Sequence, residues 1–274
     1  MALLTLGGSA TVAHIITRPR HLRAIQTRQI DETVEEITFT TEDGLTLCGW
    51  YLRHEAPRDL LIICHGYAMS RHELLDLAQA LRARGHAVLL FDFRGHGTSG
   101  GRRSTIGYRE SGDVIAAIDY LQTRPELIGL PIGVAGISMG AAASLLAAAR
   151  EPRIAAVAAD SSFAALAESA TGSLRQLCHA AAVPLSPLII HFSELLTRAR
   201  IGIIHDSNDT FIPVRNALAL HDAASEPKAL WIKAGRGHAS LWACCAAEYV
   251  ERLDGFFTQA LGTQALGAKL PSAA

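Results

Sequence analysis

From Asp59 onward, short and continuous apolar runs alternate with segments of helical pattern. Six runs are expected to be buried strands: LLIIC at 60–64, AVLLFD at 87–92, IGVAG at 132–136, AAVAAD at 155–160, IGIIH at 201–205 and ALWIK at 229–233. A strand that is apolar on both faces has to be covered on both faces, which is typical of parallel sheets connected by helices. The alternation therefore predicts an α/β fold with a mostly parallel central sheet and helices on both faces.

An antiparallel hairpin is predicted before this alternation begins. The runs EEITFTTEDG (35–44) and LTLCGWYLRH (45–54) alternate apolar and polar residues, and Glu42-Asp43-Gly44 between them is a turn signal. Helices are expected after Ser70, where Glu73 completes a capping-box pattern and Gly85 marks the end. Further helices are expected to begin near Tyr108 and after Ser138, Pro213 and His238.

Residues 35–260 are expected to form one domain, because the strand–helix alternation runs through them without a linker. Residues 163–200 interrupt it with a helical composition broken by two prolines, which predicts a short helical lid over one end of the sheet. Residues 1–34 are expected to form an N-terminal tail or surface helix, and residues 261–274 a flexible C-terminal tail.

The charge balance gives little support to a nucleic-acid partner. The net charge is −1 at pH 7, and no block of like charges occurs. The five cysteines include no C-x-x-C pair, which favours a reducing compartment and hence the cytoplasm. Residues 1–17 are too short for a membrane span and have no basic start typical of an export signal. Contact of this segment with a membrane surface is the less favoured alternative.

A literal G-x-G-x-x-G at 95–100 follows an apolar run, as in a dinucleotide-binding loop. Such a loop has to open a helix directly, so that phosphate meets the helix N-terminus. Here the helical pattern begins only near Tyr108, and the acidic Asp119 lies within it rather than after a strand. The glycines therefore predict a loop after a central strand, and no nucleotide cofactor is expected.

Other polar residues are expected to be structural. The four histidines His65, His96, His205 and His238 show no metal-ligand spacing, so no metal is expected. His96 is expected to hold its loop by hydrogen bonds, and His205 to be a satisfied core histidine. Arg94, Glu110 and Asp113 are expected to form exposed and therefore weak ion pairs. Ser161 and Ser162 are expected to be loop and helix-cap residues, and Cys244 and Cys245 to be packing residues.

The motif G-x-S-x-G at 136–140 lies between an apolar strand and an alanine-rich helix. A nucleophilic serine needs a tight strand-to-helix turn, and side chains two positions before and after it would collide. This explains Gly136 and Gly140 around Ser138. The N–H of Met139 would lie at a helix N-terminus, where it can stabilise an oxyanion. The alternative is that Ser138 is simply a helix N-cap.

A serine nucleophile needs a base and an acid that orients the base. Asp206 and Asp209 follow one predicted strand, and His238 lies in a glycine-rich loop after the next. The order serine, aspartate, histidine is the one expected for this kind of strand–turn–helix nucleophile. A second oxyanion donor is expected after the first parallel strand, and the backbone N–H of Tyr67, next to Gly66, is the candidate.

Together these motifs resemble the α/β-hydrolase superfamily over roughly residues 35 to 260, most closely its serine-aminopeptidase-like or Bem-type branch. The motifs are HG at 65–66, FRGHGTSGG at 93–101, GISMG at 136–140, HDSNDTFIP at 205–213 and GRGHAS at 235–240. The resemblance implies an eight-stranded sheet, a Ser-His-Asp triad, an ester-type substrate and no cofactor.

The family pattern HG-x-x-D-x-x-VP gives the position of the acid. With His205 and Pro213 aligned, Asp209 takes the place of the acid and Asp206 that of the usual glycine. Asp209 is therefore preferred as the triad acid. Asp206 is expected either to cap the turn or to raise the pKa of Asp209.

The predicted function is that of a serine hydrolase acting on a small-molecule carboxylic ester, thioester or amide through an acyl-enzyme. Ser138 would be the nucleophile, His238 the base and Asp209 the orienting acid, with the Met139 and Tyr67 N–H groups as oxyanion donors. One alternative is a hydrolase-like binding protein that has lost catalysis. A less favoured one is a nucleotide-binding oxidoreductase.

Overall fold

The computed structural model describes Pro19 and residues 34–164 and 199–267. The expected N-terminal tail or surface helix, almost all of the expected lid and the end of the chain lie outside the described residues. The strands are β1 (Val34–Thr40), β2 (Thr46–Leu52), β3 (Asp59–Cys64), β4 (His86–Phe91), β5 (Ile132–Ile137), β6 (Ile154–Asp160), β7 (Arg200–Asp206) and β8 (Lys228–Lys233). The helices are η1 (Arg71–Leu74), α2 (Leu75–Arg82), α3 (Glu110–Gln122), η2 (Pro125–Leu127), α4 (Met139–Arg150), α9 (Arg215–Ala223), α10 (Leu241–Cys244) and α11 (Ala246–Gly267).

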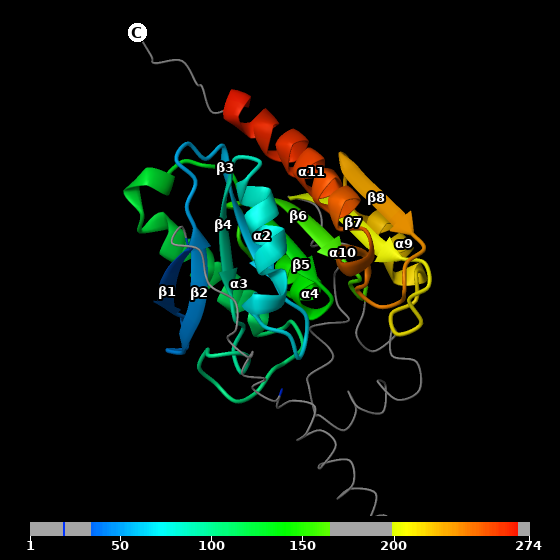
Figure 1. Cartoon of the computed structure of the whole chain (residues 1–274), viewed down its shortest axis with the longest axis horizontal. Coiled ribbons are helices and arrows are strands. Elements are labelled where there is room, and N and C mark those ends of the chain that lie inside the picture. Colours follow the sequence, from blue (N-terminus) through cyan, green and yellow to red (C-terminus); the bar gives the residue numbers. More distant parts are fainter. Residues whose placement is uncertain (1–18, 20–33, 165–198, 268–274) are drawn as a thin grey trace, which may run out of the picture.

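The strands form one eight-stranded sheet in the order β1-β2-β4-β3-β5-β6-β7-β8. β2 pairs antiparallel with β1 and with β4, whereas every pair from β4 to β8 is parallel. This confirms the predicted mostly parallel sheet with an antiparallel hairpin at its start (Figure 1). The chain leaves β3 for β4 on one side and then returns to β5 on the other. At such a reversal the loops after the strands diverge, and a crevice for ligand is expected at their carboxyl ends.

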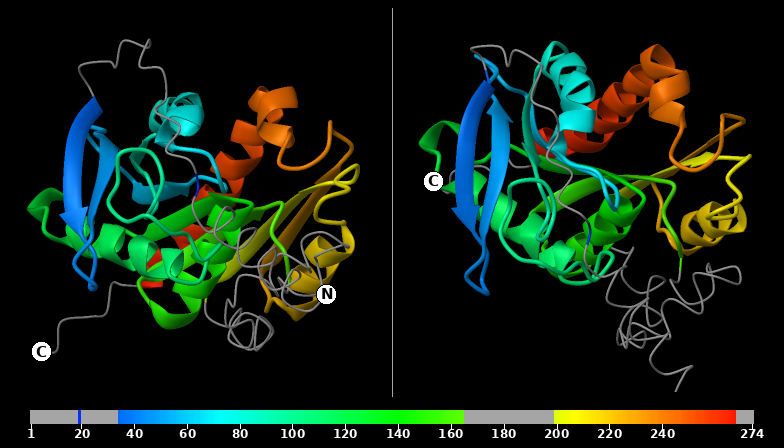
Figure 2. Two further views of the ribbon diagram at one scale, coloured as in Figure 1. Left: turned by 90° about the horizontal axis from the view of Figure 1, so that it is seen from below. Right: turned by 60° about the horizontal axis from the view of Figure 1, so that its bottom comes forward.

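Both faces of the sheet are covered, as the continuous apolar strands require. Leu60 and Ile62 of β3 pack on the side of α3, α4 and α9, whereas Leu61 and Ile63 pack on the side of α2, α10 and α11. The two helical layers are seen on opposite sides of the sheet in Figure 2. No helix in the described part of the chain has both the length and the hydropathy to cross a membrane.

Some helix boundaries differ from those predicted. The capping box at Ser70 is present, but it opens the short 3₁₀ helix η1 rather than α2 itself. α3 begins at Glu110, slightly later than the expected start near Tyr108, because the Glu110 carboxylate holds the preceding loop. α11 continues to Gly267, so the expected flexible tail from 261 begins inside this helix. The added residues include Gln, Ala and Leu, which favour helix.

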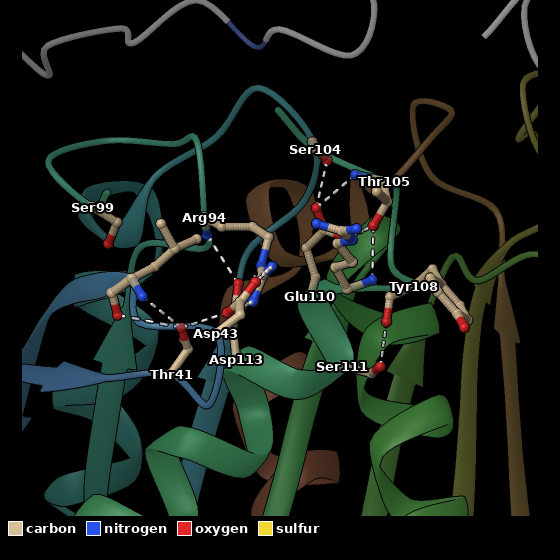
Figure 3. Close-up of polar contacts among 12 residues, drawn as sticks. Thr41, Asp43, Arg94, Ser99, Ser104, Thr105, Tyr108, Glu110, Ser111 and Asp113 are labelled. Atoms are coloured by element: carbon tan, nitrogen blue, oxygen red, sulfur yellow. Dashed lines mark hydrogen bonds and ion pairs between the residues drawn. The ribbon is translucent and has the colours of Figure 1, made fainter. Parts of the chain in front are cut away.

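Arg94, Glu110 and Asp113 are buried, which corrects the expectation of weak, exposed ion pairs. Arg94 donates from Nε and Nη2 to Asp113 Oδ1, at 2.9 and 2.7 Å, and from Nη1 to Asp43 Oδ2 at 2.7 Å. The Arg94 backbone N–H also donates to Asp113 Oδ2, at 3.0 Å. Asp113 lies in the first turn of α3, so this cluster ties the β1–β2 turn, the loop after β4 and α3 together (Figure 3).

We expect Asp113→Ala to lower the free energy of unfolding by about 3–5 kcal/mol, because it leaves the buried Arg94 guanidinium without its main partner. Asp119→Ala is a matched control on the same helix, since Asp119 is exposed and pairs with Arg153 at the surface. Its effect should stay below about 1 kcal/mol. Urea denaturation followed by circular dichroism measures both; equal effects would contradict a buried, structural role for the Arg94–Asp113 pair.

Candidate active site

The G-x-S-x-G motif forms the predicted turn between β5 and α4. Ser138 has φ 54° and ψ −115°, a conformation that L-residues rarely adopt. A Cβ atom added to Gly136 would lie 2.4 Å from the backbone of Gly140, and one added to Gly140 would lie 2.4 Å from the carbonyl oxygen of Cys64. Both glycines are therefore required by the close approach of α4 to the ends of β5 and β3, for the steric reason predicted from the sequence.

The Ser138 hydroxyl does not cap the helix that it precedes. Its Oγ instead lies 2.8 Å from Nε2 of His238, and Nδ1 of His238 lies 2.7 Å from Oδ2 of Asp209. The other carboxylate oxygen of Asp209 accepts the backbone N–H groups of Phe211 and Ile212, at 2.9 and 2.8 Å. The three predicted residues thus meet at the carboxyl edge of the sheet, from the loops after β5, β7 and β8.

This chain of contacts fixes the direction of the hydrogen bonds. An ionised carboxylate can only accept, so Nδ1 of His238 carries the proton that it donates to Asp209. Nε2 is then left with a lone pair that can accept the Ser138 hydroxyl proton. The Asp209 side chain is inaccessible to solvent, whereas that of His238 is 25% exposed. The arrangement can accept a proton from the serine and remain open to a ligand at the histidine.

Asp206 is not part of the hydrogen-bonded series Ser138–His238–Asp209. It organises the loop that carries His238. Its carboxylate accepts the N–H groups of Asn208 (2.9 Å), Gly235 (2.8 Å) and Gly237 (2.8 Å), and the Ser240 hydroxyl (2.7 Å). The contact with Asn208 caps the turn, which is one of the two roles expected for Asp206 from the sequence. The contacts with residues 235–240 show a further role, because they join the β7 turn to the neighbouring loop.

The hydrogen bonds of Asp206 together outweigh burial, which is the largest single influence on its pKa. Burial acts to raise it, but the Ser240 hydroxyl and the three backbone N–H groups stabilise the charged form and hold the pKa below the ordinary value of 3.8. A carboxyl whose pKa is lower in the folded state stabilises the protein above its unfolded pKa and loses this effect as pH falls through its folded pKa.

We therefore expect Asp206→Asn to destabilise the protein at pH 6 to 7, by about 1–3 kcal/mol for the loss of a charge-assisted hydrogen-bond acceptor. The difference from the wild type should shrink as pH falls below 3.8, where the wild-type carboxyl also becomes protonated. Urea unfolding of both proteins between pH 3 and 7 measures this. A difference that stays constant over that range would show that the charge of Asp206 is not what holds the loop.

The two expected oxyanion donors lie beside Ser138. Met139 begins α4, so its N–H belongs to the first turn, where no carbonyl of the preceding turn is available inside the helix. On the other side, a Cβ added to Gly66 would lie 3.6 Å from Cβ of Ser138. The Gly66–Tyr67 segment therefore runs directly past the serine.

His65 orients this segment, a role that was not predicted from the sequence. Its Nε2 accepts the N–H of Phe93 at 3.0 Å, and its Nδ1 donates to the carbonyl of Gly66 at 2.7 Å. The second bond fixes the peptide that carries the Tyr67 N–H. Burial, together with the neighbouring His96, lowers the pKa of His65 to about 4, so the ring is neutral at pH 7, as its hydrogen bonds require. The signal available in the sequence was the HG pair directly after a buried strand.

A second loop supports Met139 from the side of α3. Glu110 is fully buried and accepts the Ser104 hydroxyl, both donors of Thr105 and the N–H of Gly107, at 2.7 to 2.9 Å (Figure 3). The Ser104 hydroxyl also lies 3.4 Å from the Met139 sulfur. The Glu110 carboxylate thus holds the loop that packs against the first turn of α4.

Two of the remaining histidines can be compared with expectation. His96 Nδ1 lies 2.9 Å from the carbonyl of Arg94, as expected for a residue that holds its loop. His205 Nε2 donates to the carbonyl of Ile212 at 2.8 Å, but its Nδ1 is buried without a hydrogen-bond partner among the described residues. His205 is therefore only half satisfied. In the part of the chain that the structure describes, no three His, Cys, Asp or Glu side chains are grouped as metal ligands would be.

The G-x-G-x-x-G loop is filled by a side chain of the protein itself. Asp92 accepts the N–H groups of Thr98 and Arg71, at 3.0 and 2.8 Å, and pairs with the Arg71 guanidinium. A Cβ added to Gly97 would lie 2.0 Å from the Asp92 carboxylate. This carboxylate stands where the glycine-rich segment would have to receive a phosphate, and α3 begins only at Glu110.

The chain is similar to one protein family and to several known proteins. The family model for serine aminopeptidase, S33, matches residues 55–192. The chain is 32% identical over 210 residues to the uncharacterized protein Rv2307c of Mycobacterium tuberculosis, covering 74% of this chain and 72% of that protein. It is 30% identical over 127 residues to the thiohydrolase aneE of Aspergillus aculeatus, covering 45% and 40%. Its structure resembles the Pyrococcus furiosus esterase Pf2001 with a TM-score of 0.75 at 23% identity, covering 90% of this chain and 98% of that one.

The sheet order, the turn at Ser138 and the match to this family model place the chain in the α/β-hydrolase superfamily. Within that superfamily, the chain belongs to the serine aminopeptidase family. The predicted fold and superfamily are thereby confirmed.

Proposed function

We propose that the protein is a serine hydrolase that cleaves a small carboxylic ester, thioester or amide through an acyl-enzyme intermediate. The observation that carries the proposal is the continuous chain from Ser138 Oγ through His238 to Asp209, with contacts of 2.8 and 2.7 Å. Nucleophile, base and orienting acid within hydrogen-bond reach are what acyl transfer to a serine requires. The names of two similar proteins, an esterase and a thiohydrolase, support the same reaction class.

In the first half of the proposed reaction, Ser138 Oγ attacks the acyl carbon while His238 Nε2 takes its proton. The negative charge that develops on the acyl oxygen is stabilised by the N–H groups of Met139 and Tyr67. His238 then donates the proton to the leaving group, and Asp209 stabilises the imidazolium meanwhile. In the second half, a water molecule loses its proton to His238, attacks the acyl-enzyme and releases the acid, with Ser138 regaining its proton.

The surroundings of His238 favour a substrate with an apolar group. Phe211 lies two residues after Asp209, and its ring packs edge-on against the His238 ring with centroids 5.0 Å apart. Phe211 is nevertheless 50% exposed, which places apolar aromatic surface directly beside the proposed base. A substrate that covers this ring would gain hydrophobic binding energy next to the reacting bond.

The free cysteines Cys48, Cys64, Cys244 and Cys245 fit a cytoplasmic location for this enzyme.

We expect a fluorophosphonate probe to label the wild-type protein on Ser138, because the probe reacts only with a serine activated by a base. Ser138→Ala should abolish labelling. Ser111→Ala, which removes a buried hydroxyl in α3, serves as the matched control and should label like the wild type. Mass spectrometry of the labelled peptide identifies the site. Equal labelling of Ser138→Ala, or no labelling of a folded wild type, would refute the proposed function.

The assignment of the acid is tested by comparing two aspartates of one turn. Asp209→Asn should lower kcat on p-nitrophenyl esters by about 10³–10⁴-fold, because the amide favours the wrong histidine tautomer. Asp206→Asn should cost far less activity, since Asp206 does not touch His238. Steady-state kinetics at a pH where both variants are folded measures this. A larger loss for Asp206→Asn would exchange the two roles.

A further inference from the structure

Asp160 is a buried carboxylate that the proposed reaction does not use. It is the last residue of β6, between β5 and β7 in the sheet, and only 1% of it is exposed. Its Oδ1 accepts the Ser161 hydroxyl and its Oδ2 accepts the Tyr249 hydroxyl of α11, both at 2.9 Å. Burying a carboxyl group is costly unless the group has a defined set of partners, so the presence of Asp160 here calls for an explanation.

The carboxylate of Asp160 acts first through the neighbouring Ser161. We expected Ser161 to be an ordinary loop or cap residue, but its Oγ accepts the N–H of Ala239 at 3.2 Å. Ala239 directly follows His238. Ser161 and Ala239 both have positive φ, at 53° and 55°, in a region that such residues rarely adopt. Strained positions persist where their surroundings hold them, and here the two are held by one hydrogen bond to each other.

The backbone of Asp160 contacts the other reacting residue. Its carbonyl accepts the N–H of Ser138 at 2.8 Å, which supports the turn that presents the proposed nucleophile. One residue therefore reaches Ser138 through its carbonyl and the His238 loop through its carboxylate and Ser161. The distance between Ser138 and His238 depends on both connections.

The charges around this group are well defined. Burial raises the pKa of Asp160 to about 6; the hydroxyls of Ser161 and Tyr249 and the charge of His238 act against this, and Asp209 acts with it. His238 contacts Asp209 directly. It interacts electrostatically, without contact, with His205 and Asp160. Above its pKa, Asp160 is thus a second negative charge near the proposed base, besides Asp209.

The geometry points to a positioning unit formed by Asp160, Ser161 and Tyr249, which holds His238 against Ser138 and whose carboxylate helps to stabilise the protonated His238. This inference rests on the proposed function and extends it to three residues that do not touch substrate. Tyr249 anchors the unit to α11, so the packing of the last helix is connected to the site.

Ser161→Ala tests the positioning step. It removes the acceptor of the Ala239 N–H without changing charge, so kcat on p-nitrophenyl acetate and the rate of fluorophosphonate labelling should fall by about tenfold, the worth of one such hydrogen bond. KM should stay within about twofold, because no substrate contact is lost. Ser111→Ala, the buried-serine control, should change neither. Kinetics for Ser161→Ala equal to those of Ser111→Ala would overturn the inference.

Asp160→Asn tests the charge. The amide keeps the shape and one acceptor but removes the negative charge, so the acid limb of the kcat/KM profile should move to lower pH. A loss of stability alone would lower the amount of active enzyme without moving that limb. An unmoved limb in a folded variant would refute the electrostatic part. If Asp160→Asn does not fold, the two single variants Ser161→Ala and Tyr249→Phe decide the inference through kcat. Tyr249→Phe removes the second hydroxyl that donates to Asp160.

The two proposals fail in different ways. A folded wild type that reacts with no fluorophosphonate removes the serine-hydrolase function itself. A wild type that is labelled on Ser138, with Ser161→Ala and Tyr249→Phe labelled at the same rate, leaves that function intact and removes only the positioning unit.

Discussion

The close approach of α4 to the ends of β3 and β5 is the constraint on which the site depends. The helix comes so near that Gly140 leaves no room for a Cβ beside the carbonyl of Cys64. The chain can make this approach only through the unusual conformation of Ser138, which costs on the order of 1–3 kcal/mol. That cost is offset by the almost complete burial of α4, whose alanines allow the helix to lie close to the sheet. The same geometry leaves the Ser138 hydroxyl pointing away from its own helix and toward His238.

Buried carboxylates solve a second problem at the same edge of the sheet. Loops that leave parallel strands have backbone N–H groups that no ladder pairs, and buried N–H groups need acceptors. In this protein Asp92, Glu110, Asp206 and Asp209 each accept two or more such groups from the adjoining loops. Asp92 and Asp206 each join two loops, Glu110 and Asp209 each hold one, and together they fix the edge on which the serine and histidine meet. Asp209 differs from the others because its second oxygen is directed to His238.

The sequence was sufficient for features that are encoded locally. Continuous apolar runs predicted β3 to β8, and Gly136 and Gly140 predicted the turn at Ser138, because sterics act over a few residues. The partners of the charged residues were not accessible in this way. Arg94 and Asp113 read as surface residues, since charged side chains are rarely buried, and only the packing of α3 under the loop after β4 places them together. Likewise, in the sequence Asp206 looked like a substitute for glycine. Its role was not predictable, because its partners Gly235 and Gly237 are brought near by the pairing of β7 with β8.

Asp160, Asp206 and Asp209 lie around the loop of His238, and the surroundings of Asp160 and Asp206 shift their pKa values in opposite directions. Backbone N–H groups and a hydroxyl hold the pKa of Asp206 below its ordinary value, so this residue is a permanent charge at neutral pH. Asp160 accepts two hydroxyl groups, and burial raises its pKa to about 6. Because its folded pKa is raised, Asp160 makes the folded state less stable as pH rises from 3.8 to about 6. The destabilising charge of Asp160 at neutral pH is explained most simply if that charge serves the site. The contacts of Asp160 with the Ser138 turn and the His238 loop supply such a reason.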